Sequence, residues 1–136
     1  MIRWLLFSLL ALVSCSETSP PAPVADELRI ISLSPAMTRM LEDSGLGDHL
    51  VGRSAWCRLR TRASSTVPAV GDLHDRDWEM MVRLKPTHVL IQAASTATDG
   101  RLESLSAREG WSLHAWPLRT MAEVRAMLAE LPGAFA

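Results

Sequence analysis

Residues 29–54, RIISLSPAMTRMLEDSGLGDHLVGRS, decide how this chain folds. The first five of them, RIISL, are rich in β-branched residues and contain three apolar side chains, which predicts a short buried strand. Ser34 and Pro35 then supply an N-cap residue and a first-turn proline, so we expect a helix that runs from there to about Ser44 and is stopped by Gly45. A second strand is expected over 50–54. The stretch therefore predicts a strand–helix–strand unit.

The same alternation continues to the end of the chain. The further predicted elements are a helix over 78–84 capped by Asp77, a strand over 88–92, a helix over 99–109, a strand over 111–116, and a helix that opens with the capping box of 120–123 and ends at Pro132–Gly133. Alternating strands and helices imply right-handed crossovers and a parallel sheet. We therefore predict an α/β fold, a single Rossmann-like lobe of about four mostly parallel strands with helices on both faces.

The first fourteen residues have the features of a secretory leader. Arg3 supplies a positive charge, and the apolar run over 4–13 is too short to span a bilayer. The tetrapeptide Leu12-Val13-Ser14-Cys15 resembles the lipobox of bacterial lipoproteins, which implies cleavage before Cys15 and lipidation of its thiol. The alternative is an ordinary cleaved leader in which Cys15 has no role.

These features divide the chain into three parts. We expect a lipoprotein signal peptide over 1–14, a Ser/Pro-rich tether over 15–27 that is too polar to pack, and a folded lobe over 28–136. The protein is therefore expected to be periplasmic or otherwise extracytoplasmic and to be anchored to the membrane by its lipid.

Composition excludes several classes of function. The chain has 14 basic and 15 acidic residues and no basic stripe, which argues against a nucleic-acid partner. Once Cys15 is lipidated, Cys57 is the only thiol left, so no intramolecular disulfide can form. No glycine-rich phosphate loop, Ser-His-Asp arrangement or Cys-x-x-Cys pair is present. These absences argue against an enzyme, and we predict no resident cofactor.

In parallel sheets, ligands bind beyond the carboxyl ends of the strands. The segments that follow the predicted strands are 34–36 (SPA), 55–57 (AWC), 93–95 (AAS) and 116–117 (WP). An exposed rim of tryptophans suits a flat organic ligand, and a helix start suits an anionic group. The alternative is that both tryptophans belong to the core.

Two stretches, 29–57 and 67–92, resemble the N-terminal lobe of the periplasmic binding proteins for cobalamin, siderophores and haem. The matching motifs are Ser-Pro-x-x-Thr at 34–38, Pro-x-Val-Gly at 68–71 and Leu-Lys-Pro at 84–86, and the likeness extends over about 28–131. The cobalamin-binding type is the most similar. The resemblance implies the substrate-binding component, or one lobe of it, of an ABC importer for a corrinoid or related metal chelate. The implied partners are a corrinoid, haem or siderophore ligand and the importer's permease.

The resemblance also implies roles for individual residues. Carried over position by position, the residues of the ligand cleft are Pro35, Ala36, Trp56, Cys57, Leu73 and His74. Glu79 falls on the carboxylate that docks onto an arginine of the permease, a role that suits an ionised side chain near a helix start. Arg39 and Thr87 depart from the family pattern, which has Glu and Asp there. We expect the chain to form the N-terminal lobe of that family without its second lobe.

Three alternatives remain open at this point. The chain could be a truncated or vestigial lobe that acts only as a docking module, or a small extracytoplasmic hydrolase built on Cys57 and His74. The acidic loop that holds Asp72, His74, Asp75 and Asp77 could bind a cation, but such loops are usually just solvated, so we predict no metal site. The motifs do not name the ligand.

Overall fold

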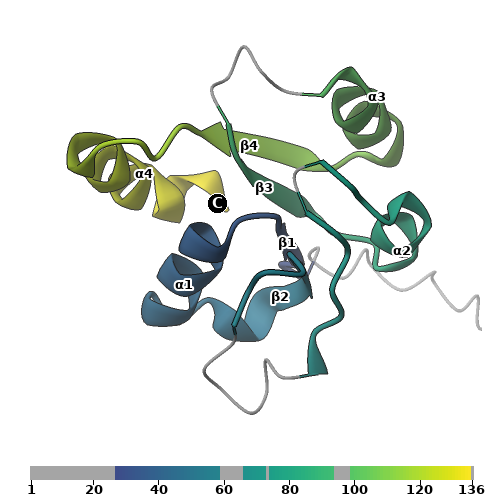
Figure 1. Cartoon of the computed structure of the whole chain (residues 1–136), viewed down its shortest axis with the longest axis horizontal. Coiled ribbons are helices and arrows are strands. Elements are labelled where there is room, and N and C mark those ends of the chain that lie inside the picture. The colour runs from purple at the N-terminus through teal and green to yellow at the C-terminus, as the bar shows by residue number, and fades with distance from the viewer. Residues whose placement is uncertain (1–26, 59–65, 73, 94–98, 136) are drawn as a thin grey trace, which may run out of the picture.

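The computed structural model describes residues 27–58, 66–72, 74–93 and 99–135. The strands are β1 (Ile30–Ser32), β2 (Leu50–Arg53), β3 (His88–Gln92) and β4 (Ser112–Trp116), as shown in Figure 1. They form one sheet in the order β2-β1-β3-β4, and every neighbouring pair is parallel. The predicted leader and lipidation site, Leu73, and positions 94 and 95 lie outside the described residues.

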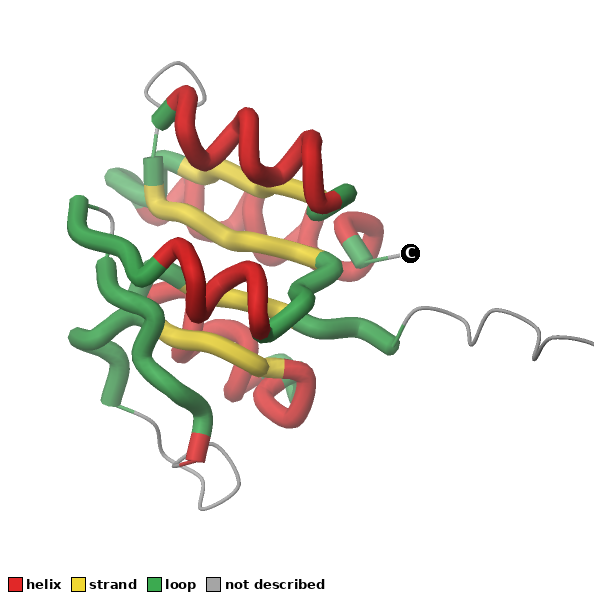
Figure 2. Tube along the Cα trace, turned by 90° about the vertical axis from the view of Figure 1, so that its right-hand side faces the viewer, coloured by secondary structure: helices red, strands yellow, loops and turns green. Residues whose placement is uncertain are grey.

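Helices cover both faces of the sheet, as Figure 2 shows. The helices are α1 (Pro35–Asp43), α2 (Trp78–Arg83), α3 (Gly100–Glu109) and α4 (Met121–Ala134), with a short 3₁₀ turn, η1, at Gly47–His49. The prediction of a single α/β lobe with a parallel sheet and helices on both faces is confirmed. No helix in the described part of the chain is both long enough and apolar enough to cross a membrane.

Two apolar cores lie on opposite sides of the sheet. Successive residues of a strand point to opposite faces, so Ile30 enters one core and Ile31 the other, and neither has any exposed surface. The core under α2 and α3 includes Met81, Val89, Ile91, Leu102 and Leu105. The core under α1 and α4 includes Met37, Leu41, Leu90, Met127 and Leu131. Burial on both faces explains why the central strands β1 and β3 read as mostly apolar runs.

The predicted end of the last helix is wrong. Helix α4 continues through Pro132 and Gly133 to Ala134, although proline removes one backbone donor and crowds the carbonyl four residues earlier. Leu131 and Phe135, four residues apart, both pack into the core under α1 and α4. A continuous helix keeps these two side chains on one face, and we attribute the passage through proline to that packing.

Candidate functional site

A cavity of about 520 Å³ opens at the carboxyl ends of the strands. The strand order places β1 beside β3, with β2 and β4 outside them, so the chain winds in opposite directions on either side of that pair. Parallel sheets bind ligands at such a switch point. The cavity is lined by Leu33, Ser34, Pro35, Ser54, Trp56, Asp72, His74, Gln92, Ala93, Pro117 and Arg119.

The ends of β1 and β3 are joined by a side-chain hydrogen bond inside this cavity. Ser34 Oγ donates to Gln92 Oε1 at 2.9 Å. Ser34 has the extended backbone of an N-cap residue, but its hydroxyl makes no capping bond to α1. Ser34 is thus the N-cap residue of α1, as predicted, while its hydroxyl bonds a partner on the neighbouring strand that the local sequence does not contain.

Trp56 stands at the rim of the cavity with 72% of its surface exposed. Its indole Nε1 donates to Asp72 Oδ2 at 3.0 Å. The alternative that Trp56 is a core residue is therefore wrong. Trp116 is half-buried, and its Nε1 donates to Glu130 Oε2 at 2.8 Å, so its indole is bonded to helix α4.

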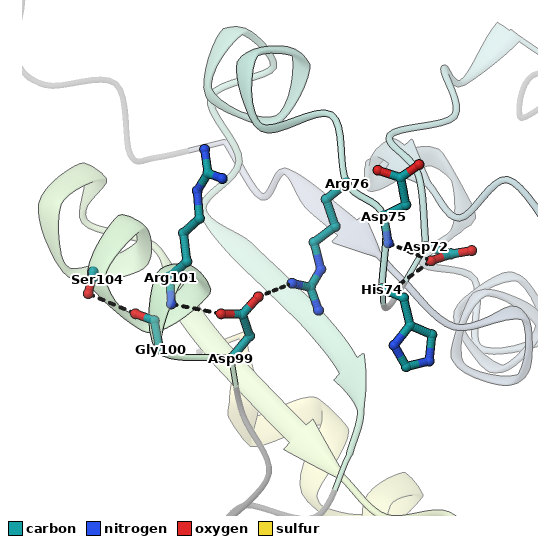
Figure 3. Close-up of polar contacts among 8 residues, drawn as sticks. All are labelled: Asp72, His74, Asp75, Arg76, Asp99, Gly100, Arg101 and Ser104. Atoms are coloured by element: carbon teal, nitrogen blue, oxygen red, sulfur yellow. Dashed lines mark hydrogen bonds and ion pairs between the residues drawn. The ribbon is translucent and has the colours of Figure 1, made fainter.

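The Asp72 carboxylate is held as an anion by three N–H donors. Its Oδ1 accepts from the backbone of Asp75 at 2.9 Å and of His74 at 2.7 Å, and Trp56 supplies the third bond (the two backbone bonds are drawn in Figure 3). These bonds, in that order of weight, lower the pKa of Asp72 to about 2. The wall of the cavity formed by this loop therefore carries a negative charge at neutral pH.

The loop that carries Asp72 is fixed at both ends. Gly71 has a φ of +96°, and its carbonyl accepts from Ala55 N at 2.8 Å. At the other end Arg76, whose side chain is only 2% exposed, bonds Asp99 at 2.6 Å, directly before α3 (Figure 3). The Arg76 guanidinium also lies 5.2 Å from the centroid of the Trp78 ring. The loop is thus tied to β2 on one side and to α3 on the other.

The structure brings together only part of the predicted ligand set. Pro35, Trp56 and His74 line the cavity, whereas Ala36 is exposed on α1 and is not among the lining residues. Cys57 is 6% exposed, and its Sγ lies 3.0 Å from Thr38 Oγ1, so its thiol points into the protein and not into the cavity. The ligand-binding role of all these residues stays a prediction.

Some residues of the cavity are absent from the predicted ligand set. Asp72 appeared in the sequence only as a member of an acidic loop, and its position after glycine with two following N–H donors is typical of an Asx turn. Gln92 is the polar last residue of an apolar strand, a signal that could have found it. Arg119 precedes the capping box and has no comparable sequence signal.

The described residues of the acidic loop are not arranged to hold a cation. Asp72 is engaged as above, and Asp77 Oδ1 accepts from Met80 N at 2.9 Å as the cap of α2. Within the described ranges, no group of three or more His, Cys, Asp or Glu side chains is placed to hold a metal ion. The described residues also contain no hydrogen bond between Cys57 and His74, the pair on which a hydrolase would depend.

Glu79 lies apart from this cavity. It is exposed in the first turn of α2, at a groove of about 440 Å³ that it shares with residues of α3. In that groove the Arg101 guanidinium lies 4.6 Å from the centroid of the Trp78 ring. Glu79 is thus available to a second macromolecule without blocking the cavity.

One protein family matches the sequence of this chain. A family model described as periplasmic binding protein matches residues 30–108. No curated protein is significantly similar to the chain in sequence.

Solved structures of similar fold cover most of this chain. The vitamin B12-binding protein BtuF of Vibrio cholerae is 24% identical, with a TM-score of 0.61, over 79% of this chain and 41% of that protein. Staphylococcus aureus IsdE, solved with haem, is 20% identical, with a TM-score of 0.63, over 80% of this chain and 40% of that protein. The haem-binding protein RhuT of Roseiflexus sp. RS-1 is 19% identical, with a TM-score of 0.61, over 79% of this chain and 42% of that protein. The chain thus spans less than half the length of each of these proteins.

Proposed function

Because the chain belongs to the periplasmic binding protein family, as its motifs predicted, we propose that it is the substrate-binding component, or one lobe of it, of an ABC importer. The proposed cargo is a corrinoid or a related metal chelate such as haem or a ferric siderophore. The observation that carries the proposal is the cavity at the switch point between β1 and β3, with an exposed tryptophan at its rim.

The chemistry of the cavity suits a flat ligand with polar edges. The Trp56 ring and Pro35 offer apolar surface on which a macrocycle can rest. Ser34, Gln92 and His74 offer hydrogen-bonding groups around it. The similarity to a vitamin B12-binding protein and to a protein solved with haem supports a ligand of this class.

We expect binding by this chain alone to be weak. Ligand pockets ordinarily enclose 70–90% of a small molecule, whereas the described cavity belongs to one lobe and its rim residue Trp56 is 72% exposed. Much of a macrocycle would then remain in water. A dissociation constant of about micromolar or weaker follows.

Calorimetric titration of the purified chain with cobalamin, hemin and a ferric siderophore tests the proposal. We expect heat of binding with at least one of the three and a loss of affinity in Trp56→Ala. Met121→Ala is the matched control, because Met121 is 68% exposed but lies on α4 outside the cavity. Tight binding that survives Trp56→Ala would refute the site. No binding to any ligand would refute import of this cargo class and favour a lobe that acts only in docking.

We further propose that Glu79 docks onto an arginine of the importer's permease. Its exposed carboxylate in the first turn of α2 is favoured by the helix dipole and stays solvated until a basic partner arrives. Glu79→Lys should weaken co-purification with the permease. Glu103→Lys, which replaces an exposed glutamate in the first turn of α3, should leave the co-purification unchanged. Equal effects of the two charge reversals would refute a specific role for Glu79.

The proposed location follows from the N-terminus together with the family. Lipidation of Cys15 would hold the lobe on the extracytoplasmic side of a membrane, joined to it by the Ser/Pro-rich tether. An importer's substrate-binding component works in that compartment, so the proposed anchor and the proposed function agree.

A further inference from the structure

An exposed tryptophan is a poor binding surface unless something holds its ring. The Trp56 side chain is 72% exposed, so packing restrains it little. An indole has a single hydrogen-bond donor, and in Trp56 that donor is engaged by Asp72 Oδ2 at 3.0 Å. The ring is thus joined to a loop that lies sixteen residues away in the sequence.

The acceptor is itself held by hydrogen bonds to the backbone. Asp72 Oδ1 accepts hydrogen bonds from the backbone N–H groups of His74 and Asp75, and Asp72 N donates to Asp75 O at 2.7 Å. Figure 3 shows the carboxylate facing the backbone of this turn. Both oxygens have defined partners, so the carboxylate cannot rotate without breaking bonds. It therefore fixes the direction in which the indole N–H must point.

We propose that Asp72 is a positioning residue, whose carboxylate holds the Trp56 ring in place as a wall of the ligand cavity before the ligand arrives. The inference rests on the proposed function, because it assumes that Trp56 contacts the ligand. A ring that is ordered in advance loses less conformational freedom on binding, and affinity rises accordingly. The lowered pKa of Asp72 keeps this tether ionised at every physiological pH.

Asp72→Asn isolates the tether from the rest of the loop. An asparagine can keep its amide oxygen at the Oδ1 position, where it accepts from His74 and Asp75. Its NH₂ group then replaces Oδ2 and cannot accept from the indole. Asp75→Asn is the matched control, since Asp75 contributes only backbone groups to the bonds of Asp72. Asp72→Ala, which removes both oxygens, serves as a second variant.

Fluorine NMR of the full chain labelled with 5-fluorotryptophan reports on the ring without any ligand. The Trp56 resonance is assigned as the one missing in Trp56→Phe. We expect it to move and broaden in Asp72→Asn and Asp72→Ala and to stay in place in Asp75→Asn. An unchanged resonance in both Asp72 variants would overturn the inference.

Binding of hemin and cobalamin then tests the consequence for affinity. We expect Asp72→Asn to weaken binding by about three- to tenfold, which is the cost of immobilising one large side chain. In a Trp56→Phe background, where no indole N–H exists, Asp72→Asn should have no further effect. A loss that persists in that background would overturn the inference, because Asp72 would then act by another route.

The two proposals fail in different ways. If neither hemin nor cobalamin binds the unsubstituted chain but the Trp56 resonance moves in Asp72→Asn, import of these ligands is refuted and the tether is supported. If hemin or cobalamin binds and the resonance stays in place, the proposed function is supported and the positioning role is refuted.

Discussion

Replacing Gly71 with alanine should damage both the stability of the protein and the wall of its cavity. Gly71 has a φ of +96°, which non-glycine residues adopt at a cost of about 1–2 kcal/mol. A Cβ at this position would also lie 2.1 Å from Asp75 O and 2.8 Å from Arg76 Cα. Both are backbone atoms of the turn that holds Asp72, so rotation of a side chain cannot relieve the clash. Overpacking of this kind costs about 1–3 kcal/mol.

The sum, about 2–5 kcal/mol, is a large share of the total stability of an ordinary domain. Urea unfolding followed by circular dichroism measures it. Gly110→Ala is the matched control, because Gly110 has a φ of +76° at the end of α3 but nothing within 4 Å of an added Cβ. The control should therefore cost only the backbone part, about 1–2 kcal/mol.

The turn around Gly71 could also relieve the clash by moving locally. The loss of stability would then be smaller, but the Asp72–Trp56 bond would break and tryptophan emission would change, which Gly110→Ala would not cause. Equal unfolding midpoints for the two variants together with unchanged emission would refute the reasoning.

Three further predictions follow from other parts of the chain. Cys15→Ala should leave the protein unprocessed or release it from membranes, and mass spectrometry showing an unmodified N-terminus beyond Cys15 would refute lipidation. Burial lowers the pKa of His88 below its usual value of 6.5. Burial also lowers the pKa of His114, and the charge of His88 adds a smaller effect in the same direction. The unfolded chain therefore binds more protons than the folded chain below about pH 6.5, so the stability from these histidines is complete above that pH and is lost as the pH decreases. The urea midpoints at about pH 7.5 and pH 5 should differ less in the double variant His88→Gln/His114→Gln than in the unsubstituted protein. Thr120→Ala should destabilise the protein by about 1 kcal/mol, because it removes the capping box that Thr120 forms with Glu123; an unchanged urea midpoint would contradict this.

Local sequence patterns predicted the elements well where the signal lies within a few residues. The strand over 88–92 has the predicted bounds, and the helix predicted over 99–109 begins one residue later because Asp99 is its cap. The end of α4 was missed, since packing of Leu131 and Phe135 outweighs the local effect of Pro132. Propensity is a local quantity, and tertiary packing overrides it.

The candidate site was predicted in place but not in detail. The carboxyl ends of the strands were expected to form it, and the cavity lies there. Trp56 and Cys57 are neighbours in sequence, yet one is exposed at the rim and the other is buried against Thr38. The direction of each side chain in a turn depends on backbone angles that residue type alone does not specify.

The sequence by itself determined the fold class and the edge of the sheet where the cavity lies, because apolar periodicity and helix caps are properties of short segments. Only the tertiary structure decided which polar groups meet at that edge. Ser34 and Gln92 are 58 residues apart and Trp56 and Asp72 are sixteen apart. Strand order and loop path bring each pair together. The buried Ser34 hydroxyl then takes the partner that the fold offers in place of the one its neighbours in sequence would supply.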